Sequence, residues 1–278
     1  RWLQPLSDPP GGKPLQRERE LKAMALSLKE VFRTGSARNL FVSGEPGTGK
    51  TICIKYILAE VRRVSEKRGL QVASVYVNAG RTRTPYFTML RIDQLLGLDV
   101  PDQGYQMYRL KKKFEDILRE KSVVIGLEEV DALLLKQREP LVYYLNRQPN
   151  TTLVLTSNTI YDAASLPSRA LSTLQLKLLH LKPYTLEQVK IILTERAARA
   201  FQPNTLPDKF LTQAAEIVAQ VGDIRAGFRI LLTAGLLAED QGKLRVDNEN
   251  LESAMKDGET PKLLQRLHQL KKKHDKLR

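Results

Sequence analysis

The chain has 278 residues, 42% of them hydrophobic, and a formal net charge of +14 at pH 7. This length and hydrophobic content suit a globular protein with one large domain or two modest ones. No apolar run nears the about 20 residues that cross a bilayer, and the single cysteine, Cys53, excludes a disulfide framework, so we expect a soluble intracellular protein. The positive charge favours nucleic acid as a partner, or less often an anionic membrane surface.

The first 14 residues are rich in proline and glycine, which predicts an extended arm and not a packed element. Apolar residues at helical spacing then predict a helix over residues 15–32, and Gly35 and Ser36 end it. A short apolar run over residues 39–43 predicts a buried strand.

The next stretch, residues 44–51, matches the P-loop pattern G-x-x-x-x-G-K-[ST] at every fixed position. A helix is predicted after it, ending at Gly69, and the flanking strand and helix argue against a chance glycine turn. Such a loop aims backbone N–H groups and a helix N-terminus at phosphate. We expect Lys50 to reach the β- and γ-phosphates of a nucleotide and Thr51 to join the Mg²⁺ ligands. The loop residues predicted to bind nucleotide are Gly44, Glu45, Pro46, Gly47, Thr48, Gly49, Lys50 and Thr51.

A second strand is predicted over residues 71–78, and helices are predicted over residues 85–97 and 105–121. The last helix carries a basic turn, residues 109–113, and a second basic cluster occupies residues 262–278. Each cluster can contact phosphate or can be a solvated helix face, and the sequence leaves both explanations open.

A buried strand over residues 122–127 delivers two acids to its carboxyl end. Ligands sit at that edge of a parallel sheet, where one carboxylate holds Mg²⁺ and another polarises the attacking water. We assign Glu128 to the metal and Glu129 to the water. The alternative is an acidic helix N-terminus that the helix dipole favours, and the upstream P-loop argues against it.

Further strands are predicted over residues 152–158 and 174–181, which brings the predicted parallel sheet to five strands. Asn158, at the end of the fourth strand, is placed to orient the hydrolytic water, although a strand that ends in Ser-Asn is also an ordinary turn signal. After Pro183 the pattern is helical, over residues 185–201, 208–221, 224–239 and 247–257. The predicted fold is therefore α/β, with an α/β nucleotide domain over residues 15–183 and an all-helical domain over residues 184–258.

Taken together, these segments resemble the AAA+ ATPases and, among them, the archaeal origin-recognition initiators. The resemblance covers roughly residues 14–258 and implies a P-loop NTPase with a parallel five-stranded sheet and a C-terminal helical lid. It is carried most specifically by the lid entry, residues 181–188, and by the Gly-Asp-Ile-Arg segment, residues 222–225. The stretch from Thr84 to Gly97 resembles the helical insertion that separates initiators from other proteins of this fold.

The resemblance implies further site residues. Arg225 would reach back to the γ-phosphate, and Arg169 is a weaker candidate for an arginine acting on a neighbouring subunit, with a helix-surface role as its equal alternative. The entry segment, residues 15–21, would lie near the adenine. Beyond the P-loop, the residues expected to contact ATP or ADP are Gln16, Arg17, Ile52, Tyr184, Ile192 and Arg225.

The chain departs from the family in two ways. The family usually has Asp-Glu where this chain has Glu128-Glu129, and a bulkier residue at Gly126, so we expect ATP to bind but turnover to be slow, with Gly126 providing room for the longer carboxylate. The family also usually continues into a winged-helix domain, whereas residues 259–278 are interpreted as a basic tail or a linker to a missing module. DNA contact would then depend on the insertion, the basic turn and this tail.

Three functions remain open from the sequence. The first is an initiator ATPase that recognises duplex origin DNA and helps load the replicative helicase, alone or with other initiator subunits. The second is a nucleotide-dependent DNA-binding switch that retains ADP through purification, and the third is an AAA+ remodeller or transposition regulator. For the first we expect a cytoplasmic, nucleoid-associated protein, nuclear if eukaryotic, with no membrane partner.

Overall fold

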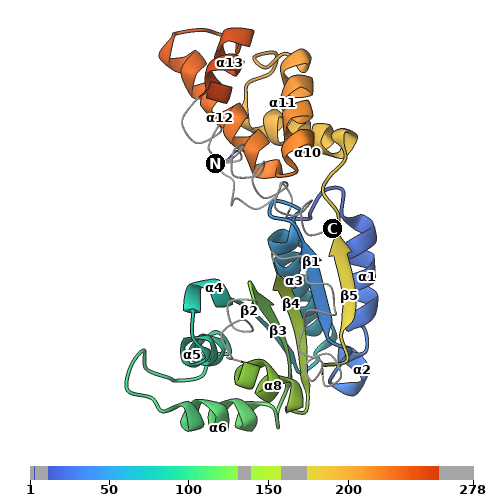
Figure 1. Ribbon diagram of the computed structural model, residues 1–278. Coiled ribbons are helices and arrows are strands. Elements are labelled where there is room, and N and C mark those ends of the chain that lie inside the picture. The colour runs from blue at the N-terminus through green and yellow to red at the C-terminus, as the bar shows by residue number, and fades with distance from the viewer. Residues whose placement is uncertain (1–2, 4–11, 131–138, 158–173, 257–278) are drawn as a thin grey trace, which may run out of the picture. The chain divides into compact units, whose positions relative to one another are not determined.

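The computed structural model describes residue 3 and residues 12–130, 139–157 and 174–256 (Figure 1). The chain forms two compact units. One contains residues 17–44 and 49–181, and the other contains residues 1–16, 45–48 and 182–278. The first unit holds a parallel sheet with helices around it, and the second holds four helices in its described part.

The sheet has five strands in the order β2-β3-β4-β1-β5, and every neighbouring pair is parallel. Strands β3 and β4 are buried along their whole length, which explains their near-continuous apolar sequences. The predicted five-stranded parallel sheet is therefore confirmed. Its strands are β1 (Leu40–Gly44), β2 (Val72–Asn78), β3 (Ser122–Glu128), β4 (Thr151–Ser157) and β5 (Lys177–Leu181).

Seven helices of this unit lie in the described part of the chain. Proline at the first turn and the Thr84 hydroxyl, which accepts from the Phe87 N–H, fix the start of α5. Left-handed glycines end two others, Gly35 after α2 and Gly69 after α3. The helices are α1 (Glu18–Leu28), α2 (Val31–Thr34), α3 (Lys50–Arg68), α4 (Ala79–Thr82), α5 (Pro85–Leu95), α6 (Met107–Ile117) and α8 (Glu139–Arg147).

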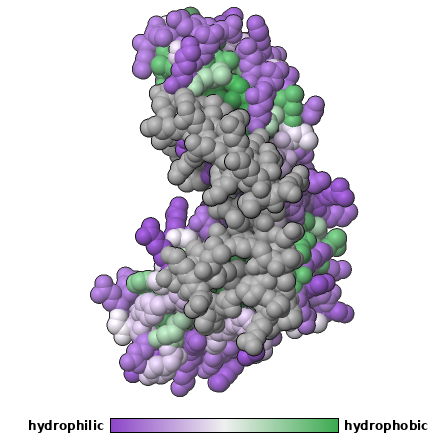
Figure 2. Space-filling view, in the orientation of Figure 1, coloured by the Kyte–Doolittle hydropathy of each residue, from purple (hydrophilic) through white to green (hydrophobic). Residues whose placement is uncertain are grey.

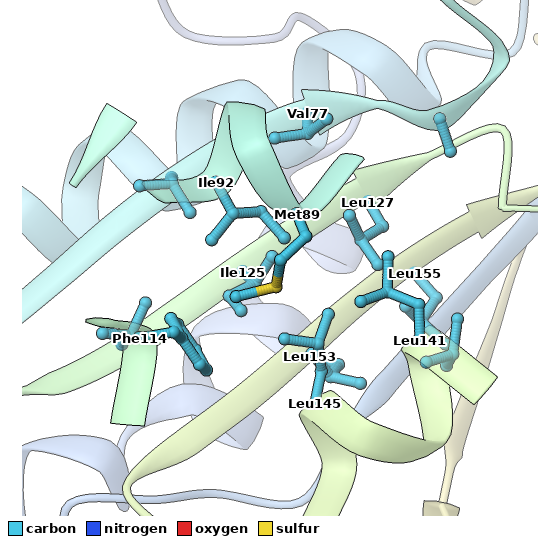
Figure 3. Close-up of a cluster of buried hydrophobic side chains, with 14 of the residues drawn as sticks. Val77, Met89, Ile92, Phe114, Ile125, Leu127, Leu141, Leu145, Leu153 and Leu155 are labelled. Carbon is cyan, nitrogen blue, oxygen red and sulfur yellow. The ribbon is translucent and has the colours of Figure 1, made fainter. Parts of the chain in front are cut away.

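Alternate residues of the central strands point into two different apolar cores. Ile125 and Leu127 of β3 pack with α5, α6 and α8, and Met89 of α5 lies at the centre of this cluster (Figure 3). Val124 of β3 and Val154 of β4 face the other way and pack with α1 and α3. Helices thus cover both faces of the sheet, as the alternating strands and helices of the sequence predict.

The second unit is helical in its described part, as expected. A capping box starts α10, in which the Thr185 hydroxyl accepts from the Gln188 N–H and the Gln188 side chain accepts from the Thr185 N–H. Gly222 ends α11 in the left-handed conformation, and the Asp223 carboxylate starts α12. Their buried side chains form one core. The helices are α10 (Leu186–Ala200), α11 (Asp208–Val221), α12 (Ile224–Asp240) and α13 (Asn248–Lys256).

Several element boundaries differ from the sequence predictions. The helix predicted over residues 15–32 starts later, at Glu18, because Gln16 has a positive φ of 58°. It is also divided into two helices, because the chain turns at Lys29–Glu30 before α2. The last strand begins at Lys177 and not at residue 174. Helices α4 and α8 were not predicted, since neither is long enough to show clear helical periodicity.

Within the described ranges, no helix is both long and apolar enough to cross a membrane. The longest one, α3, has 19 residues and carries several charges on its exposed side.

One buried charge in the first unit has consequences for stability. Asp93 on α5 is fully buried, and neither of its carboxylate oxygens has a hydrogen-bond partner in the described part of the chain. Burial raises the pKa of this carboxyl to about 7, and the charge of Lys113 on α6 lowers it only in part. Tyr144 on α8 also feels the Asp93 charge, although its own hydroxyl donates to Glu115 and to the Lys111 carbonyl. The folded state therefore binds a proton at Asp93 more tightly than the unfolded chain does.

We expect this carboxyl to make the protein less stable as the pH rises from about 4 to about 7. A folded-state pKa above the unfolded value means that the stabilising proton is bound at low pH and lost as the pH passes the folded value. Urea unfolding at pH 5 and pH 8 should show this loss in the wild type and a smaller loss in Asp93→Asn. An equal loss in both proteins would contradict the prediction.

Candidate nucleotide site

The P-loop joins β1 to α3. Gly47 and Gly49 have φ values of 78° and 89°, in the left-handed region that residues with a Cβ rarely adopt. Gly49 is the N-cap of α3, and no side chain in the described residues caps this helix. The N-terminus of this 19-residue helix directly follows the glycine loop, and the N–H groups of a helix N-terminus suit an anion such as phosphate.

Lys50, the first residue of α3, is buried, and its ammonium donates to the Gly44 carbonyl at 2.8 Å. This hydrogen bond directs the Lys50 side chain back toward the first residue of the loop. Inside the loop, the Thr48 hydroxyl and N–H both donate to the Glu45 carbonyl, at 2.8 and 3.4 Å. The loop is thus closed by its own hydrogen bonds, and its lysine bonds to its first residue.

The end of β3 brings a carboxylate to the start of α3. Glu128 is buried, and its Oε1 accepts from the Thr51 hydroxyl. Its Oε2 accepts from the Tyr76 hydroxyl and, at 2.9 Å, from the Asn78 side-chain amide. Mg²⁺ in nucleotide sites commonly takes one or two protein oxygens, with phosphates and waters completing the octahedron. Thr51 and Glu128 present a hydroxyl and a carboxylate side by side, and so they fit this metal.

Tyr76 and Asn78 were not among the predicted site residues. Both lie on β2, whose register pairs Asn78 with Glu128 and Tyr76 with Gly126. Burial and then the hydrogen bond to Glu128 raise the pKa of Tyr76, so its hydroxyl is the donor at neutral pH. The two-residue period of a strand places residues 76 and 78 on the same face of β2. Because β2 lies beside β3, which ends at Glu128, this period is the sequence signal that could have predicted both residues.

Glu129 directly follows β3 and has a positive φ of 53°. Its carboxylate lies against Gly80 in α4, close enough that a Cβ at residue 80 would collide with Oε2. The two acids thus have different surroundings. Glu128 lies between α3 and β2, whereas Glu129 lies against α4.

Gly126 has a different role from the expected one. A Cβ at this position would lie 2.5 Å from the Leu58 Cδ1 and 2.9 Å from the Ile54 Cδ1. The missing side chain therefore lets α3 pack closely on β3, and the space beside it is filled by leucine and isoleucine, not by Glu128.

Arg225 is the second residue of α12, and its guanidinium pairs with both oxygens of Asp223, at 2.6 to 3.0 Å. Asp223 is buried and also caps the helix through the Arg225 N–H. The loop residues 45–48 belong to the same unit, and a Cβ at Gly47 would collide with the Asp223 carboxylate. Asp223 thus holds the arginine and also packs on the loop.

The other predicted site residues fall into four groups. Arg17 is buried in the first unit and pairs with Glu20 at 3.1 Å, and Ile52 is half-buried near the start of α3. Tyr184 and Ile192 are buried in the core of the helical unit. Asn158 and Arg169 lie outside the described residues. Gln16, with its positive φ, precedes α1.

Two family models match this chain. The AAA domain matches residues 33–159, and the Cdc6 AAA+ ATPase-type lid domain matches residues 190–256. The first model covers the P-loop and the two acids, and the second covers most of the helical unit.

The chain is also similar to individual archaeal proteins. It is 29% identical over 248 residues to the ORC1-type DNA replication protein of Pyrococcus furiosus, covering 84% of this chain and 59% of the relative. The ORC1-type DNA replication protein 1 of Sulfurisphaera tokodaii is 31% identical over 245 residues, with 84% and 61% covered. The chain thus spans about three fifths of the length of the curated relatives it matches.

Among solved structures, the Aeropyrum pernix ORC1 protein in complex with DNA superposes with a TM-score of 0.82 at 29% identity, covering 92% of this chain and 69% of that one. The ADPNP-ADP complexes of the Aeropyrum pernix ORC2 protein share the fold, with a TM-score of 0.78 at 19% identity.

Proposed function

We propose that this chain is an AAA+ protein of the archaeal ORC1/Cdc6 type, which binds ATP with Mg²⁺ and uses the bound nucleotide to initiate replication at duplex origin DNA. The observation that carries the nucleotide part is the contact between Thr51 and Glu128 at the helix N-terminus that follows the glycine loop. The DNA part is supported by the basic charge of the chain and by the Aeropyrum relative that was solved with DNA.

In this proposal Lys50 binds the β- and γ-phosphates, and Thr51 and Glu128 hold the metal. Bound Mg²⁺ would neutralise charge on the phosphate oxygens. Glu129 polarises the attacking water, which Asn158 orients. Arg225 reaches the γ-phosphate from the helical unit, and Arg169 acts on the site of a neighbouring subunit.

The contacts proposed for the adenine side follow the family resemblance. Gln16 and Arg17 precede α1 or cap it, and Arg17 is held by Glu20. Ile52 would supply an apolar contact from α3. Tyr184 and Ile192 lie at the start of the helical unit, at and within α10.

The proposed DNA contact in the described part of the chain is the basic surface of α6. Arg109 and Lys112 are exposed there, and Lys111 lies with its ammonium 4.4 Å from the Tyr144 ring centroid. Arg109 and Lys113 also lie over aromatic rings, those of Tyr108 and Tyr105. Figure 2 shows mostly hydrophilic residues toward the lower left of the view, the region that α6 occupies in Figure 1. Cations that neutralise phosphates give salt-sensitive and weakly sequence-specific binding.

The further partners we propose are the replicative helicase, which the protein would help to load, and other initiator subunits. A cytoplasmic, nucleoid-associated protein fits this role. The domain division proposed is an α/β nucleotide domain over residues 15–183, a helical lid over residues 184–258, and a basic tail over residues 259–278.

Two other functions remain testable. A binding switch with slow nucleotide exchange would keep its nucleotide and so retain ADP through purification, and the glutamate at the metal position favours this function. A remodeller or transposition regulator would instead form nucleotide-dependent hexamers. The initiator-type lid favours the replication function over the remodeller.

We expect Lys50→Ala to weaken ADP binding at least about tenfold, because a charge-assisted hydrogen bond contributes roughly 1.5–3 kcal/mol. Titration with a fluorescent ADP analogue measures this. Lys67→Ala, at the exposed end of the same helix, is the control and should bind like the wild type. Affinities within twofold of each other for the Lys50 variant and the wild type would refute the assignment.

We expect Glu128→Asp to hydrolyse ATP several-fold faster than the wild type, because aspartate brings the carboxylate back to the length that the family uses. Steady-state phosphate release at saturating ATP and Mg²⁺ is the measurement. Glu129→Gln should bind nucleotide and show almost no turnover. If Glu128→Asp brings no gain and the wild type is already as fast as an Asp-Glu relative, slow turnover is not a property of this protein.

We expect the α6 surface to contribute to DNA affinity through charge alone. Arg109→Gln combined with Lys112→Gln should reduce the slope of log K against log salt by roughly 2, since each phosphate contact contributes about 0.9. Fluorescence anisotropy with duplex DNA at several salt concentrations gives the slope. The matched control neutralises Lys67 and Arg68, two exposed cations at the end of α3. An unchanged slope in the α6 variant, or an equal drop in the control, would exclude a specific α6 contact.

A further inference from the structure

The carboxylate at the metal position has one methylene more than an aspartate and therefore one more rotatable bond. A glutamate side chain therefore gives up more rotamer entropy than an aspartate when it is fixed. A metal ligand with a longer stem needs more restraint from its neighbours if it is to present one oxygen reliably.

The two oxygens of Glu128 have different partners. The Tyr76 hydroxyl and the Asn78 amide both donate to Oε2, from the same face of β2, whereas Oε1 accepts from Thr51 on α3. Oε2 is therefore held by two donors. Oε1 contacts the hydroxyl of Thr51, the residue that the P-loop pattern assigns to the metal.

The Tyr76 ring is itself held in place from α3. The ammonium of Lys55, one helical turn after Thr51, lies 5.2 Å from the ring centroid, a distance at which a cation attracts the ring face. The register places Tyr76 opposite Gly126, so the phenol reaches Glu128, which lies two residues further along β3. The contacts of Tyr76 thus link β2, β3 and α3 at the start of the nucleotide-binding helix.

From these contacts we propose that Tyr76 is a positioning residue: by holding Oε2 of Glu128 it keeps Oε1 facing Thr51, ready for the divalent cation that accompanies the nucleotide. The inference rests on the proposed nucleotide function and adds a residue that acts through Glu128. A tyrosine that only filled space on β2 would need its ring but not its hydroxyl.

The test compares Tyr76→Phe with the wild type in full-length protein. Mn²⁺ serves as the metal probe, and free Mn²⁺ is measured by electron paramagnetic resonance at saturating ADP. Outer-shell partners of metal ligands typically change metal affinity 10- to 100-fold, so we expect the variant to bind Mn²⁺ about tenfold more weakly. ADP affinity in the presence of EDTA should change less than twofold, because the hydroxyl contacts no part of the loop.

Tyr144→Phe is the matched control. Its hydroxyl also donates to a glutamate, Glu115, but it lies on α8, which packs in the other core. This variant should bind Mn²⁺ as the wild type does. The second measurement combines Tyr76→Phe with Glu128→Asp. In that background the tyrosine change should have a much smaller effect on Mn²⁺ affinity, because the shorter carboxylate depends less on the phenol.

The possible failures are distinct. If the wild type binds ADP with Mn²⁺ and Tyr76→Phe binds Mn²⁺ equally well, the positioning role is wrong and the proposed function stands. If Tyr76→Phe loses Mn²⁺ and metal-free ADP binding to the same extent, or has an equal effect beside Glu128→Asp, the hydroxyl does not act through Glu128. If the wild type takes up no ADP at all, the proposed function fails and the inference fails with it.

Discussion

The contact between Thr51 and Glu128 joins the first turn of the P-loop helix to the end of the central strand β3. It can form only if α3 packs tightly on β3, and the absence of a side chain at Gly126 permits this packing, because Ile54 and Leu58 fill the space. It also requires the parallel register that brings β2 beside β3 at the same height. Core packing and sheet register therefore fix the site before any nucleotide arrives.

The helices proposed to bind nucleotide and DNA, α3 and α6, pack on opposite faces of the sheet. Helix α3, whose N-terminus is the proposed phosphate site, packs in the core that contains Val124 and Val154. Helix α6, with the basic surface, packs through Leu110 and Phe114 in the core on the opposite face. In the second unit, Asp223 holds Arg225 and also packs on Gly47, which belongs to the same unit.

Much of this arrangement could be predicted from the sequence. The strands were predicted from short apolar runs, which they have because they are buried on both faces. The roles expected for Lys50 and Thr51 came from the P-loop pattern. The acids after β3 were expected at the carboxyl edge, and Glu128 lies there in contact with Thr51.

The remaining features depend on which segments become neighbours. Nothing local in the sequence of β2 shows that Tyr76 will reach a carboxylate 52 positions away. Gly126 was expected to make room for Glu128, but its neighbours are side chains of α3. This packing could not be predicted from the sequence around Gly126. The same holds for Asp93, a charged residue inside a helix pattern that gave no sign of being buried without a hydrogen-bond partner among the described residues. Asn158 and Arg169 lie outside the described residues, so their roles remain predictions.

The central claim is that phosphate binds at the N-terminus of α3 with a metal between Thr51 and Glu128. A crystal structure of the full chain with a non-hydrolysable ATP analogue and Mg²⁺ tests it most directly. The account predicts the β-phosphate on the backbone N–H groups of residues 47–51, and the metal next to the Thr51 hydroxyl with Glu128 beside it. Phosphates bound elsewhere, or a metal remote from both side chains, would contradict it.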